Sequence, residues 1–325
     1  MTIDTLSDVL RAVRLTGAVF FSFDASTPWV AEAPPARELG AHLMPGIEHV
    51  IEYHVMKRGT AWGGIIGEER VRLDTGDVIV FPQGDPHVLS SAPGMRAPAN
   101  RPAAPPRAVT RLPITIRHEG GGPERAEVVC GFLGCDLRPF NPLLEALPRV
   151  IHVPRRGAED SVFGQLVALA VAESAAHSAG SDSMLARVSE LLFIEVVRRY
   201  VATLPPEQRG WLAGLRDERI GRVLGMVHQR PAHPWSLDEL AHKAGMSRSN
   251  LAESFANLVG LPPMQYLARW RMQLAATLLS TTSLGLAEIA DRVGYGSEAA
   301  LSRAYKRSVG VAPADWRRGK RPVRS

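Results

Sequence analysis

This sequence of 325 residues has only two cysteines, no long apolar run and no secretion signal. Two cysteines exclude the dense disulfide framework of small secreted domains. A membrane-spanning helix needs about 20 apolar residues in a row, and no run here approaches that length. The N-terminus, MTIDTLSDVLRAV, has early acidic residues in place of a basic segment followed by an apolar one. We therefore expect a cytoplasmic protein without membrane association, long enough for two domains.

Positive charge is concentrated in the C-terminal third of the chain. Residues 210–325 hold 17 lysines and arginines against 9 aspartates and glutamates, whereas residues 1–209 hold 21 against 24. A basic segment joined to a mildly acidic one indicates that only the basic segment binds a polyanion. The alternative is a merely solvated basic face, and the motifs in the same segment argue against it.

The segment 286–310 has the pattern of a helix-turn-helix. Four apolar residues give its first helix one apolar face, and Gly294 suits the turn that follows. Ser297 is a favoured N-cap for a second helix, which carries Leu301 and Tyr305 at i, i+4 spacing. A glycine-containing turn between two short helices is the sequence form of this motif.

The same pattern occurs about fifty residues earlier, at 236–260. There Gly245 and Ser247 stand at the positions of the turn glycine and the N-cap serine. An amphipathic helix over 264–280 connects the two copies. An internal duplication of this kind indicates two equivalent binding modules in one chain.

Two helix-turn-helix copies joined by one long helix resemble the DNA-binding domain of the AraC/XylS family of transcription regulators. The segment GYGSEAALSRAYKRSVGVAPADWR is similar to that family's signature over nearly its whole length. The resemblance covers about residues 211–319. It implies an all-α domain over 210–325 that binds double-stranded promoter or operator DNA, a homodimer, contact with RNA polymerase, and activation rather than repression.

The resemblance also implies which residues contact DNA, because a recognition helix presents its N-terminal residues to base edges in the major groove. In the first copy the predicted DNA-binding residues are Arg248, Ser249, Asn250, Ala252 and Glu253. In the second copy they are Glu298, Ala299, Ser302, Arg303, Lys306 and Arg307. The apolar residues predicted to face inward and hold the helices are Leu251, Phe255, Leu301 and Tyr305.

Different chemistry is expected of these contacts. An arginine such as Arg303 can bind guanine through two hydrogen bonds, worth about 1–3 kcal/mol of discrimination. Glu253 departs from the family, in which a basic residue is common at this position; its carboxylate can accept from cytosine N4 but repels phosphate. Predicted phosphate contacts, which position the protein without reading sequence, are Arg248, Lys306, Arg307, Arg269 and Arg271.

Residues 1–153 have a different pattern, with short β-rich runs separated by glycine and proline, which predicts a sandwich or barrel. The segment GDVIVFPQGDPH, ending at His87, resembles the second motif of the cupin jelly-roll family. The first cupin motif is poorly kept, because Pro45 and Ile47 stand where its paired histidines are expected. A Pro/Ala-rich segment at 91–113 is predicted to be a mobile loop. The resemblance implies an effector-sensing cupin-like domain.

Candidate effector-binding residues in this domain are Glu52, His54, Trp62 and His87. Glu52 and His54 lie two residues apart, so one strand would present both on the same face. Three interpretations of Cys130 and Cys135 are open. They are small buried hydrophobic residues, a redox-switched pair, or ligands of a zinc ion shared with His54 and His87. On a regular strand their odd separation would put the thiols on opposite faces, unless Gly131 and Gly134 supply a bend.

Residues 154–209 are predicted to form a helical linker or dimerisation segment, with two helices near 162–177 and 184–201. The second helix has an apolar stripe too broad for a lone surface helix. It either packs against the cupin-like domain or forms the dimer interface, or does both.

The sequence thus predicts an α+β protein with a cupin-like jelly roll at 1–153, the helical segment at 154–209 and the DNA-binding domain at 210–325. The expected function is sequence-specific transcription regulation modulated by an effector. A metal- or redox-responsive regulator using the two cysteines is the alternative. A metal-dependent cupin enzyme is the rival class, and we expect no catalysis, since neither a nucleophile–base pair nor a phosphate loop is visible.

Overall fold

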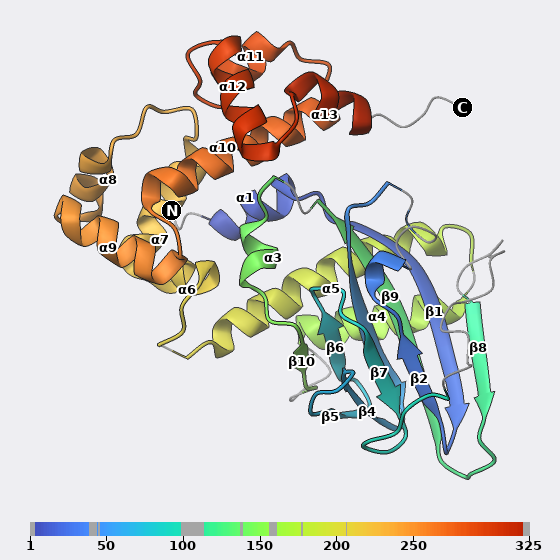
Figure 1. The fold of residues 1–325 in the computed structure, drawn as a ribbon. Helices are drawn as coiled ribbons and strands as arrows, with labels where there is room; N and C mark the ends of the chain where they lie inside the picture. The colour runs from blue at the N-terminus through green and yellow to red at the C-terminus, as the bar shows by residue number, and fades with distance from the viewer. Residues whose placement is uncertain are drawn as a thin grey trace. The chain divides into compact units, whose positions relative to one another are not determined.

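The computed structural model describes residues 4–38, 44, 46–98, 114–136, 139–155, 161–176, 178–205 and 207–320. The chain forms a strand-rich unit, residues 15–135 and 147–203, and a helical unit, residues 1–14, 136–146 and 204–325 (Figure 1). Residues 99–113 of the predicted loop, and Pro45, lie outside the described residues. No helix among the described residues is long and apolar enough to cross a membrane.

These units group the chain differently from the linear segments expected from sequence. The helices predicted at 154–209 pack with the strands, whereas residues 4–14, 136 and 139–146 pack with the C-terminal helices. The boundaries at 153 and 209 stay predictions.

Ten strands form the strand-rich unit. Their bounds are β1 (Thr16–Ser26), β2 (Val30–Ala33), β3 (His49–Arg58), β4 (Thr60–Ile65), β5 (Val71–Asp74), β6 (Val78–Phe81), β7 (His87–Ser90), β8 (Ile114–Glu119), β9 (Arg125–Cys135) and β10 (Ile151–Val153) among the described residues. One sheet has the order β10-β6-β3-β9-β1-β8 and the other β2-β7-β4-β5. Strands β1 and β8 are parallel, and the other paired strands are antiparallel.

The two sheets share one apolar core. Phe23 and Trp29 from the first part of the chain cluster with Ile79, Phe81 and Leu89 from β6 and β7. Because side chains alternate between the faces of a strand, β1, β6 and β9 each give residues two positions apart to this core, such as Ile79 and Phe81. The predicted sheet-rich, cupin-like architecture is confirmed.

Two long helices accompany the strands, α4 (Val162–Ala176) and α5 (Ser181–Thr203). Helix α5 lies against β1 at Gly17, where a Cβ atom would come within 2.1 Å of the Ala186 carbonyl oxygen. The buried Tyr53 hydroxyl and the Ser189 hydroxyl, 2.7 Å apart, form a hydrogen bond between β3 and α5. A glycine therefore permits the close approach of helix and sheet.

The helical unit contains the predicted duplication. Its helices are α1 (Thr5–Ala12), α3 (Pro142–Ala146), α6 (Trp211–Arg216), α7 (Glu218–Gln229), α8 (Leu237–Ala244), α9 (Arg248–Val259), α10 (Pro263–Thr281), α11 (Leu286–Arg292), α12 (Glu298–Val309) and α13 (Pro313–Lys320). Helices α8 and α9 form the first helix-turn-helix, α11 and α12 form the second, and α10 connects them (Figure 1). The all-α C-terminal architecture is confirmed.

Candidate functional site

Local sequence signals fix the start and turn of both helix-turn-helix motifs. The Ser247 hydroxyl accepts a hydrogen bond from the Asn250 amide at 3.3 Å, and Ser297 accepts from the Ala300 amide at 3.1 Å. Both serines therefore cap the predicted helices, α9 and α12. Gly245 and Gly294 have φ of +67° and +78°, the left-handed conformation that glycine adopts without strain.

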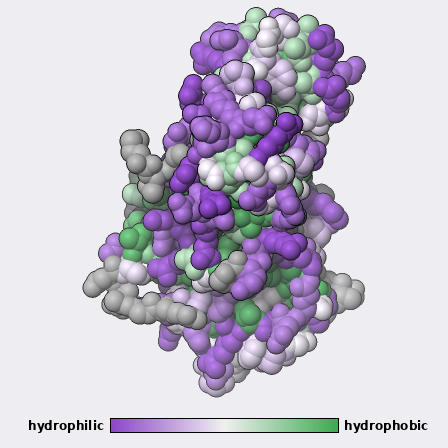
Figure 2. All heavy atoms as spheres, turned by 90° about the vertical axis from the view of Figure 1, so that its left-hand side faces the viewer, coloured by the Kyte–Doolittle hydropathy of each residue, from purple (hydrophilic) through white to green (hydrophobic). Residues whose placement is uncertain are grey.

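The inward and outward faces of α9 and α12 also agree with the sequence pattern. Leu251, Phe255, Leu301 and Tyr305 are completely buried. Among the predicted DNA-binding residues, Ala252 and Ser302 are half-buried. The fully exposed ones are Arg248, Ser249, Asn250, Glu253, Glu298, Ala299, Arg303, Lys306 and Arg307. Hydrophilic side chains predominate on the face drawn in Figure 2, around smaller apolar patches.

Some polar residues near α9 already have partners within the chain. The Arg248 guanidinium lies 3.6 Å from the Asp238 carboxylate, with both side chains exposed, so this pair is weak and easily exchanged for phosphate. Arg271 is half-buried and donates hydrogen bonds to the carbonyl oxygens of Pro231 and His233, at 2.7 and 2.8 Å. Arg271 thus holds the loop before α8, and its predicted phosphate contact stays a prediction.

A second candidate site is a cavity of about 120 Å³ between the two sheets. Its walls are mostly apolar, with Phe21 and Phe23 from β1, Leu89 from β7 and Phe132 from β9. The polar groups that line it include Glu52, His54, His87 and Cys130. Sequence analysis missed the aromatic wall, although the alternation of VFFSF and the neighbouring positions of Cys130 and Phe132 carried the signal.

Three side chains converge in this cavity. The Nε2 atoms of His54 and His87 lie 2.7 Å apart, and His87 Nε2 lies 3.8 Å from a Glu52 carboxylate oxygen. They form the one group of metal-ligand type found among the described residues. Glu52 and His54 face the same cavity, as their spacing predicts. Trp62 on β4 is opposite Ser90 in the ladder and is not among the lining residues.

Burial controls the charge of this group. Burial raises the pKa of Glu52 to about 8 and lowers the pKa of His87 to about 4. It also holds the pKa of His54 well below its usual value. At neutral pH the isolated site thus holds two neutral imidazoles and a protonated carboxyl, because desolvation disfavours every charged form.

The donor set fits a divalent transition metal such as zinc. Neutral imidazoles and a carboxylate are ligands that zinc accepts. The buried Glu52 Oε1 atom has no hydrogen-bond partner, so a cation would satisfy an acceptor that the fold leaves unpaired. Binding would release the Glu52 proton, since ligands bind in their deprotonated form.

The two cysteines have different surroundings. The Cys130 sulfur lies 2.9 Å from His54 Nδ1, the ring nitrogen opposite the one that faces His87. Burial raises the pKa of the Cys130 thiol, so it stays protonated. The β3–β9 register runs without a shift from His54–Cys130 to His49–Cys135, so alternation puts the two thiols on opposite faces. This arrangement disfavours an intramolecular disulfide, and the metal-ligand group found among the described residues includes neither cysteine.

Comparisons with known proteins identify the families that the two parts of the chain resemble. The family described as Cupin matches residues 4–202, and the family described as Helix-turn-helix domain matches residues 240–319. An AraC-like transcription regulator of Streptomyces antibioticus is 31% identical over 98% of this chain and 100% of its own length. The HTH-type transcriptional regulator AlkR of Acinetobacter baylyi is 34% identical over 56% of this chain and 60% of its own. The DNA-binding domain of AdpA, solved with a target DNA, is 29% identical over 31% of this chain and 92% of its own, with a TM-score of 0.31.

Proposed function

Because this chain belongs to the AraC family of transcription regulators, with a cupin domain ahead of its helix-turn-helix domain, we propose that it reads DNA with α9 and α12 together. The observation that carries this proposal is the pair of serine-capped helices whose predicted DNA-facing residues are almost all exposed. Two reading helices in one chain favour a site that occupies successive major grooves, about 34 Å apart.

The proposed contacts divide by chemistry. Arg303 is exposed on α12 and reads a guanine, whereas Lys306 and Arg307 bind phosphates. Glu253 on α9 reads cytosine or lowers the affinity of the first helix, since its carboxylate repels phosphate. Asn250 accepts a hydrogen bond from Ser254 at 2.8 Å, which orients its amide group.

Substitution of Arg303 tests the proposed DNA contact. The preferred site would first be selected from random double-stranded DNA with the full chain. We expect Arg303→Ala to lower affinity for that site about 10- to 100-fold and to relax specificity at one base pair. Arg72→Ala, which removes an exposed arginine from β5, is the matched control and should leave affinity unchanged. Equal affinity of Arg303→Ala and the unaltered chain for the selected site would refute the assignment.

We further propose that the cavity of the strand-rich unit holds the effector that modulates DNA binding. Its apolar walls and a single cluster of buried polar groups are the usual composition of a small-ligand site. We propose that this cavity binds an effector without converting it, so that the chain is a regulator and not an enzyme. We also propose that the chain acts in the cytoplasm, contacts RNA polymerase and activates transcription.

A homodimer is proposed through the helices of the strand-rich unit. Helix α4 exposes Val162 and Leu169, and α5 exposes Met184 and Leu191. Helix α4 is apolar around its circumference, and such a helix is normally buried. A second copy of the chain would cover these side chains.

A metal-responsive regulator is the second candidate, because Glu52, His54 and His87 converge with an unpaired carboxylate oxygen. Zinc bound there would supply a fixed positive charge that orders β3 and β7. Native mass spectrometry of the full chain with zinc should show one ion per chain. His87→Ala should abolish this binding, whereas Cys135→Ser should retain it. Zinc retained by His87→Ala would place the metal elsewhere, and no binding by the unaltered chain would favour an organic effector.

A further inference from the structure

Two segments outside the C-terminal region are built into the helical unit. Val9, Ala12 and Val13 of the N-terminal segment are at most 4% exposed, and α1 contacts α7, α10 and α3. Phe140, Leu143 and Leu144 are at most 3% exposed, and the Phe140 ring packs edge-on against Tyr266 of α10, 5.5 Å between centroids. Residues 4–14, 136 and 139–146, here called the clamp segments, are therefore part of the core around α10.

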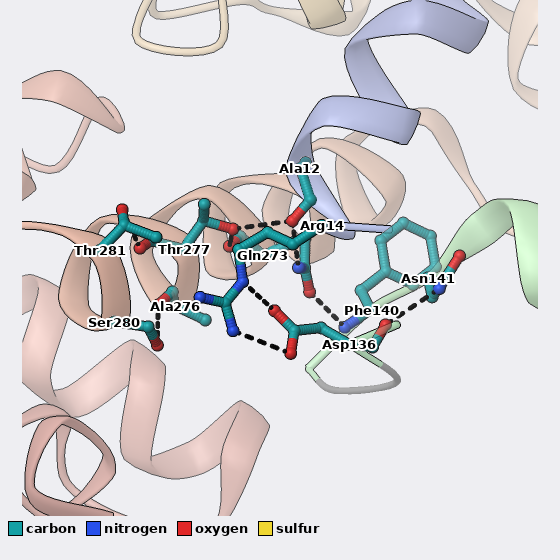
Figure 3. Close-up of polar contacts among 10 residues, drawn as sticks. All are labelled: Ala12, Arg14, Asp136, Phe140, Asn141, Gln273, Ala276, Thr277, Ser280 and Thr281. Carbon is teal, nitrogen blue, oxygen red and sulfur yellow. Dashed lines mark hydrogen bonds and ion pairs between the residues drawn. The ribbon is translucent and has the colours of Figure 1, made fainter. Parts of the chain in front are cut away.

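One buried side chain of α10 binds both clamp segments. Gln273 is 1% exposed, and its Oε1 accepts a hydrogen bond from the Phe140 amide at 3.1 Å (Figure 3). Its Nε2 donates to the Ala12 carbonyl at 3.2 Å, and the Thr277 hydroxyl lies 3.0 Å from the same carbonyl oxygen. A single amide group thus satisfies the backbone of two segments that are far apart in sequence, and burial makes the loss of either bond costly.

The clamp segments are also tied to each other. The Arg14 guanidinium binds the Asp136 carboxylate through two contacts, at 2.7 and 3.2 Å (Figure 3). The Asp136 amide donates to the Val13 carbonyl at 2.9 Å, and the Asn141 side chain donates to the Asp136 carbonyl at 2.9 Å. Arg14 has a φ of +47°, an uncommon conformation for a residue with a side chain. These contacts hold the two segments as one piece.

Each clamp segment continues directly into a strand that lines the cavity. Residue 14 precedes β1 and residue 136 follows β9, and these strands pair antiparallel from Thr16–Gly134 onward. Phe21 of β1 and Cys130 of β9 are opposite each other in that ladder, and both line the cavity. A ligand that alters the pairing or position of β1 and β9 therefore displaces both clamp segments together.

We propose that the clamp segments transmit the state of the cavity to α10 through Gln273. Helix α10 joins the two helix-turn-helix motifs, so a change at its centre alters how α9 and α12 are spaced for DNA. Signal transfer then depends on the two hydrogen bonds that Gln273 forms with Phe140 and Ala12, in addition to the packing of the clamp segments against α10. This inference rests on the proposed roles of the cavity and of the two reading helices.

Amide hydrogen exchange of the full chain, without effector or DNA, tests the coupling. Phe132→Ala enlarges the cavity from β9, and we expect exchange in α10 to rise about ten-fold. In the Gln273→Leu background, Phe132→Ala should add less than about two-fold in α10, because the connection is already broken. Gln265→Leu makes the same chemical change at an exposed position of α10 and should preserve the full response.

Two results would overturn the proposal. One is faster exchange in β9 of Phe132→Ala with α10 unchanged. The other is an equal increment in α10 with and without Gln273, because a merely structural glutamine gives independent effects. Phe132→Leu, a milder change, and Gln273→Glu, which keeps the acceptor for Phe140, replace any variant that does not fold. Since neither effector nor DNA is used, these outcomes are separate from those that test the proposed function.

Discussion

At the scale of single residues, a buried histidine connects the stability of the helical unit to pH. The Tyr266 hydroxyl forms a hydrogen bond of 2.7 Å with His228 Nε2 and accepts another from Trp211 Nε1, also at 2.7 Å. The His228 ring lies 4.1 Å from the ring of Trp270, between centroids. Burial lowers the pKa of His228 to about 3, so the folded chain holds it neutral across the physiological range.

The sign of the pH effect follows from this lowered pKa. The unfolded chain binds a proton at this histidine below about pH 6.5, whereas the folded chain does not, so stability is lost as pH falls. Between pH 7 and pH 5 we expect this residue to lower the free energy of unfolding by about 2 kcal/mol. Urea unfolding at both pH values should show a smaller decrease for His228→Gln. An identical decrease in the variant would show that His228 is protonated in the fold.

At the scale of elements, the packing of α5 on β1 depends on Gly17. A Cβ atom there would come within 2.8 Å of the Cα atom and carbonyl carbon of Ala186, closer than such atoms approach. The tight contact brings the apolar face of α5 onto the sheet and places Ser189 beside Tyr53. The helix must therefore move if position 17 gains a side chain.

Gly17→Ala tests this packing. We expect it to lower the free energy of unfolding of the strand-rich unit by about 1–3 kcal/mol, because an inserted methyl group forces a backbone shift. Gly296→Ala is the control, since an added Cβ atom at position 296 meets nothing within 4 Å and φ there is not in the left-handed region. Thermal unfolding followed by circular dichroism measures both variants. Equal midpoints would mean that α5 adjusts freely against the sheet.

At the scale of the whole molecule, the exposed apolar residues of α4 and α5 predict self-association. Leu169 is 40% exposed and Leu191 51% exposed, in helices whose other large apolar residues are mostly buried. We expect a dimer in light scattering after size exclusion. Leu169→Glu combined with Leu191→Glu should produce a monomer, because a carboxylate cannot be desolvated in an apolar interface without a partner. Thr115→Glu, at an exposed position of β8, is the control. A dimer that persists in the double variant would place the interface elsewhere.

The sequence by itself determined the features that depend on local interactions. Ser247 and Ser297 cap helices, Gly294 takes a left-handed turn, and the i, i+4 spacing of Leu301 and Tyr305 gives the buried face of α12. Glu52 and His54 are two positions apart, which placed both side chains on one face of β3. Caps, turns and periodicities involve residues near each other in the chain, so one sequence suffices to recognise them.

Only the tertiary structure decided which distant residues meet. The separation of 33 positions between His54 and His87 gives no sign that their ring nitrogens lie 2.7 Å apart, because that distance depends on how the two sheets face each other. The structure likewise placed Cys130 and Cys135 on opposite faces through an unbroken register, and it showed that Arg271 binds the loop before α8. Residues 4–14, 136 and 139–146 pack with the C-terminal helices, which no local pattern of the sequence indicated. A buried amide satisfies whichever backbone groups the fold brings to it, and those groups lie more than a hundred residues away along the chain.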